Sequence, residues 1–373
     1  MKAPTAVRTQ ATRVAPKSFP GAWLAYLACA LLLIAVAQST CAAPPKSKPH
    51  KPDKLFASAD PLVLTITAPW RDLVHDKKGP ASYRATLEYT DEAGSKHDLA
   101  LAVEHRGLTR LRLCDFPPIR LRFAKGVAKG SVFRGSKSLK LATHCKNGER
   151  SEEYYVKEML AYRIYNLMTD LSFRVRPVSI TYFDSKQASA DGPHFGFLIE
   201  DDGALAKRNG LKKLRVPGAE LGKLDSLAIN RFALFEYLIG NTDWAVLNGP
   251  SPDHCCHNSV LLGPNPQGTI YAVPYDFDSS GLVDASYAVP NASLKIRNVT
   301  QRVFRGFCAK NATLEAARRE YLEREPQILD VVRNESRLSP RTGENAHAYL
   351  STFFEILRDD EKFAKDIKEK CRK

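Results

Sequence analysis

The segment Gly240-Asn241-Thr242-Asp243-Trp244 follows a strongly apolar stretch, residues 226–239, and the two together decide how the second half of the chain folds. Asp225 can cap the start of a helix with its side chain, and Gly240 suits the end of one, where a left-handed backbone is common. Because apolar residues surround most of this predicted helix, we expect it to be buried. It would deliver Asp243 at its end.

Two more polar motifs lie at the ends of predicted strands. His257-Asn258 directly precedes one strand, and Tyr275-Asp276-Phe277-Asp278 follows the next, with a hairpin between them. If the backbone is extended here, both acids point to the same side while Phe277 packs inward. Magnesium prefers hard oxygen ligands, and phosphoryl transfer needs such an ion together with a residue that orients the acceptor. We therefore predict one metal and phosphate site formed by Asp243, Asn258, Asp276 and Asp278.

Simpler explanations exist for each of these residues. Taken alone, each is more easily explained as a turn or cap residue. Asn248 lies nearer to Asp243 in the sequence than Asn258 does, but Asn248-Gly249-Pro250 is typical of a turn. We prefer Asn258 because it directly precedes a strand, and the choice between the two asparagines stays open. His254-Cys255-Cys256-His257 is a competing zinc or copper motif, although adjacent ligands suit a tetrahedral site poorly.

The first half of the chain alternates apolar and polar side chains, which is the period of strands with one buried face. A helix is predicted within this half, at 151–167, and from about 311 to 370 the pattern is charged and helical. The expected class is α+β, with a β-rich lobe at 60–200 and a mostly helical lobe at 201–373. The predicted strands of the first lobe are 62–67, 83–89, 99–104, 119–123, 138–142, 178–183 and 195–200.

The composition sets limits on the class of protein. The chain has 373 residues, of which 44% are hydrophobic, so it can bury a substantial core in two lobes. Its net charge of +14 would suit nucleic acid, but no recognition-helix motif accompanies the charge. We therefore expect a solvated basic surface and no specific nucleic-acid partner.

The N-terminus has the pattern of a targeting segment. Basic residues precede an apolar run, Ala22–Ala37, that is short for a membrane span, and small residues allow cleavage after Ala42. We expect a signal peptide at 1–42 and a disordered linker rich in proline and lysine at 43–59. An uncleaved anchor is the alternative, and a lipoprotein at Cys41 suits the sequence less well. In each case the rest is exported, periplasmic or secreted, and meets the membrane only through the N-terminal segment.

Six cysteines remain outside that segment, and an even number in an exported chain indicates disulfides. Sequence alone leaves many pairings open. We favour Cys114 with Cys145, since both border predicted strands of one sheet. The next expectation is Cys255 or Cys256 with Cys308.

The order of the site motifs resembles the protein-kinase pattern of a catalytic aspartate, an asparagine, a hairpin and a metal-binding aspartate. More closely, the chain resembles the CotH family of spore-coat protein kinases and their exported relatives. The resemblance covers roughly residues 100–285. It also rests on three further motifs: Arg106-Gly107, Lys137-Ser138-Leu139-Lys140-Leu141 and Phe195-Gly196-Phe197-Leu198-Ile199-Glu200. It implies a two-lobed protein-kinase-like fold, with an antiparallel sheet and one main helix in the N-terminal lobe.

The resemblance also implies a role for each matching residue. Asp243 would be the catalytic base or hydroxyl orienter, and Asn258, Asp276 and Asp278 would be metal ligands. Lys140 would meet the nucleotide phosphates, with its charge held by Glu158. Arg106 and Gly107 would form a phosphate-covering turn, and Glu200 would lie near the adenine. A solvated strand lysine and an exposed surface acid are the structural alternatives for Lys140 and Glu158.

The implied function is an exported atypical kinase that transfers the γ-phosphoryl group of ATP, with Mg²⁺ or Mn²⁺, to a protein Ser or Thr hydroxyl. The alternative is a non-catalytic, kinase-like envelope or surface protein that binds nucleotide or metal without transfer, since ATP is scarce outside the cytoplasm. A third reading is a metal-dependent phosphoester hydrolase, which is disfavoured because no histidine is paired convincingly with these aspartates.

Overall fold

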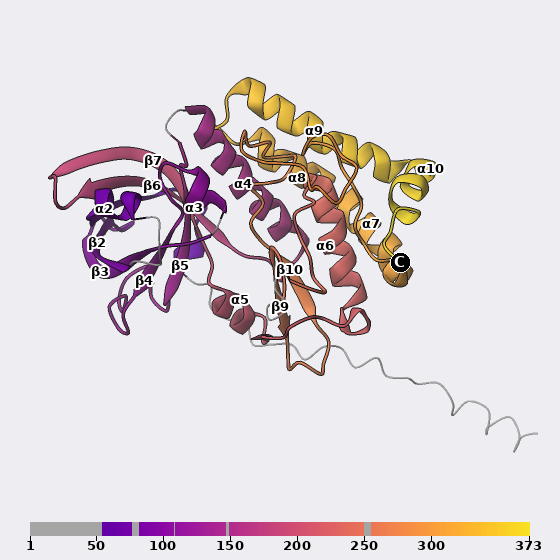
Figure 1. Cartoon of the computed structure of the whole chain (residues 1–373), viewed down its shortest axis with the longest axis horizontal. Helices are drawn as coiled ribbons and strands as arrows, with labels where there is room; N and C mark the ends of the chain where they lie inside the picture. The colour runs from indigo at the N-terminus through magenta and orange to yellow at the C-terminus, as the bar shows by residue number, and fades with distance from the viewer. Residues whose placement is uncertain (1–53, 77–81, 108, 147–148, 250–254) are drawn as a thin grey trace, which may run out of the picture. The chain divides into compact units, whose positions relative to one another are not determined.

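The computed structural model describes residues 54–76, 82–107, 109–146, 149–249 and 255–373 (Figure 1). The strands are β1 (Leu62–Ala68), β2 (Ser82–Thr90), β3 (Lys96–His105), β4 (Ile119–Phe123), β5 (Ser138–Thr143), β6 (Val175–Asp184), β7 (Ser189–Ile199), β8 (Lys212–Lys213), β9 (Ser259–Gly263) and β10 (Tyr271–Pro274). The longer helices are α4 (Glu149–Met168), α6 (Ser226–Ile239), α7 (Leu314–Glu323), α8 (Glu325–Arg333) and α9 (Pro340–Arg358). Shorter helical segments are η1 (Lys54–Phe56), α2 (Trp70–His75), α3 (Thr109–Leu113), α5 (Asp202–Arg208), η2 (Leu221–Lys223), η3 (Cys308–Thr313), α10 (Asp360–Phe363) and η4 (Ala364–Lys368).

Seven strands close into a barrel in the order β1-β2-β3-β4-β5-β7-β6. Neighbouring strands are antiparallel except at the closure, where β1 lies parallel to β6 and Leu64 is level with Ile180. The alternating pattern turns one set of side chains into the barrel, where Ile66, Leu87 and Val103 are fully buried. Each such side chain contributes about 1.5–3 kcal/mol of hydrophobic stabilisation.

The two-lobed protein-kinase-like fold, with an antiparallel sheet in its N-terminal lobe, is therefore a wrong expectation. The sheet is closed and mixed, because β1 and β6 pair in parallel. Alternation along a strand predicts which face is buried, but it does not predict which distant strand lies alongside. The pairing of two strands far apart in the sequence was thus invisible in the pattern.

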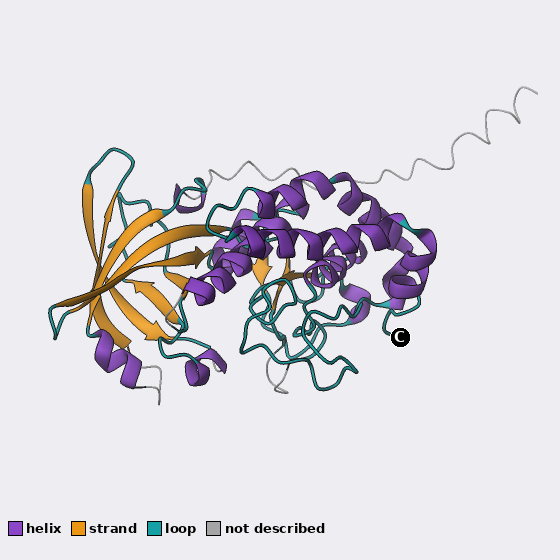
Figure 2. Ribbon diagram, turned by 90° about the horizontal axis from the view of Figure 1, so that it is seen from above, coloured by secondary structure: helices purple, strands orange, loops and turns teal. Residues whose placement is uncertain are grey.

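Helix α4 packs on the outer face of the barrel, beside β5 and β7. On this helix the ring of Tyr162 lies 5.8 Å from that of Phe197 in β7 and 4.5 Å from that of Phe277, between ring centroids. α4 also contacts α6 and α8, and Figure 2 shows the strands of the barrel on one side and most of the helices on the other. The helix therefore joins the barrel to the loop that carries Asp276 and Asp278.

A second, small sheet in the order β10-β9-β8 supports the loops of the predicted site. Phe232 of α6, Trp244 and Leu261 of β9 belong to one buried cluster beside this sheet. In this way α6 and the β9–β10 hairpin hold the segment after Asp243 and the segment after β10 in place.

The disulfides agree with the predictions in part. Cys114 bonds to Cys145, as predicted. The expected pairing of Cys255 or Cys256 with Cys308 is wrong, because Cys308 bonds to Cys371 and the two adjacent cysteines bond to each other. The start of η3 lies against the C-terminal residues, where the Cys308 N–H donates to the Arg372 carbonyl at 2.9 Å.

The N-terminal predictions concern residues that are mostly not described. The signal peptide at 1–42 and the linker up to residue 53 lie outside the described residues. The description begins at η1, within the predicted linker, where Leu55 is buried against the barrel. Among the described residues, every helix is too short or too polar to span a bilayer.

Candidate functional site

The end of α6 positions Asp243. Gly240 ends the helix with φ at +66°, and a Cβ atom there would come within 2.0 Å of the Tyr349 hydroxyl oxygen, so glycine is required. The next residue, Asn241, is buried, and its Oδ1 accepts a hydrogen bond from the Asp243 N–H at 2.9 Å. Asp225 caps the other end of the helix, as predicted, by accepting a hydrogen bond from Ala228 N–H at 2.8 Å. The half-exposed carboxylate of Asp243 is thus held by a fixed turn.

His257 and Asn258 both contact Asp243. Nε2 of His257 lies 2.8 Å from Oδ1 of Asp243, and Nδ2 of Asn258 donates to its Oδ2 at 3.1 Å and to its backbone oxygen at 2.7 Å. The hydrogen bond to Asp243 raises the pKa of His257, although burial opposes this. These bonds use only the amide nitrogen of Asn258, and its side-chain oxygen is the atom that could bind a metal. Asn248, by contrast, is exposed and bridges to Gly218.

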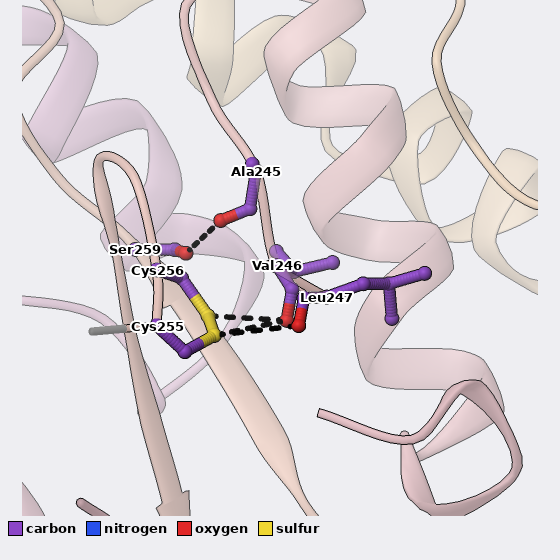
Figure 3. Close-up of a disulfide and its surroundings, with 6 residues drawn as sticks. All are labelled: Ala245, Val246, Leu247, Cys255, Cys256 and Ser259. Carbon is purple, nitrogen blue, oxygen red and sulfur yellow. Dashed lines mark hydrogen bonds between the residues drawn. A yellow bond between two sulfur atoms is a disulfide. The ribbon is translucent and has the colours of Figure 1, made fainter. Parts of the chain in front are cut away.

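Cys255 and Cys256, just before this pair, form a disulfide with each other (Figure 3). Sγ of Cys256 lies 3.1 Å from the carbonyl oxygen of Val246, and Sγ of Cys255 lies 3.7 Å from that of Leu247. The chain after Asp243 therefore runs alongside the chain that leads into β9. Because both sulfurs are in a disulfide, the competing zinc or copper motif lacks its thiolate ligands, and its His254 lies outside the described residues.

Arg110 is the shared partner of three carboxyl groups. Its Nε lies 3.1 Å from Oδ2 of Asp278, its Nη2 lies 3.2 Å from Oδ1 of Asp276, and its Nη1 lies 3.5 Å from Oε2 of Glu158. We refer to Arg110, Glu158, Asp276 and Asp278 as the carboxylate cluster. The backbone at Asp276 is not extended, since φ is +66°, yet both aspartates reach the same cation. Phe277 between them is fully buried, as predicted.

Burial and charge give the members of the carboxylate cluster different protonation behaviour. Burial raises the pKa of Asp278, and it raises that of Glu158 to about 8, although Arg110 lowers both. Burial also acts to raise the pKa of Asp276, but Arg110, Arg106 and Lys140 outweigh it, and the pKa is lowered. Asp276 therefore stays ionised at neutral pH. Its side chain is 33% exposed, so it is the member best placed to meet a cation from solvent.

Replacing Glu158 with glutamine should change how stability depends on pH. The folded-state pKa of Glu158, about 8, lies above its ordinary value of 4.5, so the folded protein binds this proton more tightly than the unfolded chain. The wild-type protein should lose this part of its stability as pH rises from 4.5 to about 8. Each pKa unit corresponds to about 1.4 kcal/mol, so Glu158→Gln should gain a few kcal/mol relative to the wild type across this range.

Urea unfolding of both proteins at several pH values between these limits measures the effect. The expected direction is specific: as pH rises, the free energy of unfolding of the variant should increase relative to that of the wild type. If the free energies of unfolding of the two proteins change in parallel with pH, Glu158 is hydrated and has an ordinary pKa.

Lys140 lies on the outer face of β5. Its Nζ is 3.2 Å from Oδ1 of Asp202 and 4.4 Å from the ring centroid of Tyr275, the residue before Asp276. Burial lowers the pKa of Lys140, whereas Asp202 and Asp276 raise it. The expected pairing with Glu158 is wrong, because Asp202 at the start of α5 takes that place and Glu158 faces Arg110. Glu158 is also fully buried, so it is not the surface acid of the alternative interpretation.

Arg106 and Gly107 follow β3 in the turn that leads to α3. Gly107 has φ at +72°, and open space surrounds the position of a Cβ atom there. Nε and Nη2 of Arg106 are buried and have no hydrogen-bond partner among the described residues. Burial and the nearby Arg110 lower the pKa of Arg106, which Asp276 and Glu158 raise. Unsatisfied donors of a buried guanidinium next to another cation are suited to an anionic ligand.

Glu200 contacts Arg208 and the backbone of Arg174. Its Oε2 lies 2.9 Å from Nη2 of Arg208 and accepts a hydrogen bond from the Arg174 N–H at 3.1 Å. Arg174 and Arg208 line a cavity of about 260 Å³, and none of the predicted site residues lines it. Glu200 thus holds Arg208, and no contact among the described residues brings it to Asp243 or Asp276.

Three residues of the site were missing from the sequence prediction: Arg110, Asp202 and, as a partner of Asp243, His257. A signal for Arg110 was present, because the predicted Cys114–Cys145 disulfide ties the short helix α3 to the end of β5. That bond brings Arg110 toward the strand that carries Lys140. His257 was quoted as part of a motif, but sequence spacing did not predict its contact with Asp243.

A comparison with models of protein families finds none that matches this chain, and no curated protein matches it either. The resemblance to the CotH family therefore stays a prediction.

Proposed function

We propose that this protein is an exported phosphotransferase that moves the γ-phosphoryl group of ATP, with Mg²⁺ or Mn²⁺, to a serine or threonine hydroxyl of a protein. The observation that carries the proposal is the charge around Asp276. Arg110, Arg106, Lys140 and His257 all lower its pKa, although they come from distant parts of the chain. Phosphoryl transfer depends mainly on such positioned charges and needs little covalent chemistry from the protein.

The donor set suits a hard divalent cation. Arg110 contacts one oxygen of Asp276 and one of Asp278, and the other oxygen of Asp278 accepts a hydrogen bond from the Ser279 hydroxyl at 3.4 Å. A metal ion would bind the second oxygen of Asp276 and replace Ser279 at that of Asp278. Asn258 adds an amide oxygen beside Asp243. Mg²⁺ is usually held by one or two carboxylates together with the phosphates themselves. Asp276, Asp278 and Asn258 would hold the ion, which when bound would neutralise charge on the transferring phosphoryl group.

Lys140 and Arg106 are suited to the phosphates that are not transferred. Lys140 is mostly buried and close enough to Asp276 for each to shift the pKa of the other. Arg106 has buried donors without partners among the described residues. Both cations would bind and orient the polyphosphate chain from the barrel side of the site.

Asp243 is suited to orient the acceptor hydroxyl. Its side chain is 47% exposed, whereas that of Asp278 is 12% exposed, so a protein substrate can reach Asp243. His257 and Asn258 fix the orientation of its carboxylate. Asp243 would accept a hydrogen bond from the serine or threonine hydroxyl and take up its proton during transfer.

Export is supported by the disulfides. Cys114–Cys145 and Cys308–Cys371 join segments that are far apart in the sequence. Such bonds form and persist in oxidising compartments and are rare in the cytosol. An exported enzyme would need ATP supplied outside the cytoplasm, which is why transfer itself must be measured.

The experiment is a transfer assay with γ-labelled ATP. The purified full chain with Mn²⁺ should label itself or an added protein acceptor, and Asp243→Asn should abolish labelling while circular dichroism and thermal unfolding stay unchanged. ATP binding without any transfer would overturn the proposal in favour of a non-catalytic binding protein.

A second candidate, a metal-dependent phosphoester hydrolase, is favoured by one observation. His257 lies 2.8 Å from Asp243, so the absence of a paired histidine no longer counts against hydrolysis. The histidine could protonate a leaving oxygen, since Asp243 raises its pKa. Release of phosphate from simple phosphoesters without ATP, lost in His257→Ala, would identify this activity.

A further inference from the structure

Three side chains of types that can bind a metal ion lie close together on the barrel, at the end of β5 and along β7. One ligand atom from each of His144, Asp191 and His194 lies within 4.8 Å of the others. Nε2 of His194 is 3.0 Å from Oδ1 of Asp191, and the two imidazole rings stack with their centroids 3.9 Å apart. None of these residues belongs to the carboxylate cluster or to the group around Asp243.

A second carboxylate stands beside the group. Oε1 of Glu152, on α4, lies 3.8 Å from Nδ1 of His194. The same oxygen accepts a hydrogen bond from the Phe195 N–H at 2.9 Å, which fixes it against β7. His194 is thus flanked by carboxylates on both of its ring nitrogens, and partners of this kind fix the tautomer and orientation of a metal-bound imidazole.

His144 is held rigidly. It is 3% exposed, its ring lies 4.5 Å from that of Phe116, and the next residue, Cys145, is bonded to Cys114. Asp191 is exposed, which gives an ion a path from solvent.

We propose that His144, Asp191 and His194 bind one transition-metal dication of the Zn²⁺ type, while Glu152 faces the ring nitrogen of His194 that does not bind the ion. Two imidazoles and a carboxylate suit Zn²⁺, Cu²⁺ or Ni²⁺, whereas Mg²⁺ prefers an all-oxygen set. Tetrahedral ligands about 2.1 Å from zinc are about 3.4 Å apart, so separations of up to 4.8 Å in the present group must shorten by as much as about 1.4 Å. Rotation of the partly exposed His194 ring out of the stack supplies this movement. The bound ion would tie the end of β5 to β7.

Calorimetric titration of the purified, metal-free full chain with zinc chloride at pH 7 tests the proposal. The wild-type protein should bind one equivalent of Zn²⁺ at this site and unfold at a higher temperature when zinc is present, because the ion binds the folded state. His194→Ala and Asp191→Asn should each weaken this binding by at least about 10-fold. Mg²⁺ at the same concentration should not compete with zinc at this site.

Two matched variants control for binding to other histidines. His97 pairs with Asp91 at 2.7 Å, and His257 pairs with Asp243 at 2.8 Å, so each is a histidine–aspartate pair outside the proposed site. His97→Ala and His257→Ala should keep the zinc equivalent that His194→Ala loses. The proposal is overturned if wild-type protein binds no zinc, if His194→Ala binds it as tightly, or if the control variants lose it equally.

Discussion

Replacing Arg110 with methionine is expected to lower the free energy of unfolding by about 3–5 kcal/mol. Its side chain is 8% exposed and contacts Asp276, Asp278 and Glu158. Methionine occupies similar space but leaves these carboxyl groups without their shared cation, and a buried charge that loses its partner is strongly destabilising. The loss should be smaller at pH 5 than at pH 8, because protonation of the carboxyl groups removes the unbalanced charge.

Urea denaturation of the variant and the wild type at both pH values measures this difference. Arg122→Met is the matched control, because Arg122 pairs with Glu104 but its side chain is 47% exposed. Arg122→Met should lower the free energy of unfolding by less than about 1 kcal/mol, as for other exposed ion pairs. If Arg110→Met lowers the free energy of unfolding equally little, water and not Arg110 compensates the charge of the carboxylate cluster.

Replacing Asp276 with asparagine is expected to reduce phosphoryl transfer by more than about 100-fold, because even the outer partners of metal ligands usually account for about 10- to 100-fold. Asparagine has almost the same shape, and the backbone N–H that donates to the Tyr162 hydroxyl at 2.9 Å is unchanged. The variant should therefore stay folded. What it loses is the one cluster carboxylate whose pKa is lowered and whose side chain is substantially exposed.

The assay compares transfer rates at saturating ATP and Mn²⁺, with unfolding measured in parallel. Asp330→Asn is the control, since Asp330 forms a half-exposed pair with Arg333 on α8 and contacts none of the site residues. It should retain wild-type transfer. Full activity in Asp276→Asn would exclude this aspartate as a metal ligand.

Local features of the molecule were predictable from the sequence. The strand at 119–123 and the helix at 226–239 have the predicted bounds, because alternation and an apolar surface are properties of neighbouring residues. The turn at Gly240 was predictable for the same reason. Asp276 and Asp278 meet at one cation because they are close in the sequence, and Asp243 meets Asn258 where the chain enters β9.

Contacts between distant segments were not predictable. Barrel closure depends on β1 meeting β6, and neither strand carries a signal for the other. The partner of Lys140 was misassigned for a similar reason. A buried lysine needs an acid, but the sequence offers many, and only the position of α5 selects Asp202 over Glu158. Glu200 pairs with Arg208, eight residues further on, and the sequence pattern did not predict this contact.

The most direct test of the central claim is the thermal unfolding of the full chain with Mn²⁺ alone, ATP alone and both together. A ligand that binds only the folded state must raise the unfolding temperature. If Asp276, Lys140 and Arg106 hold one metal–nucleotide complex, both ligands together should stabilise the wild type more than the sum of the separate effects. Asp276→Asn should lose this excess. An unfolding temperature that Mn²⁺ and ATP together leave unchanged would contradict the account.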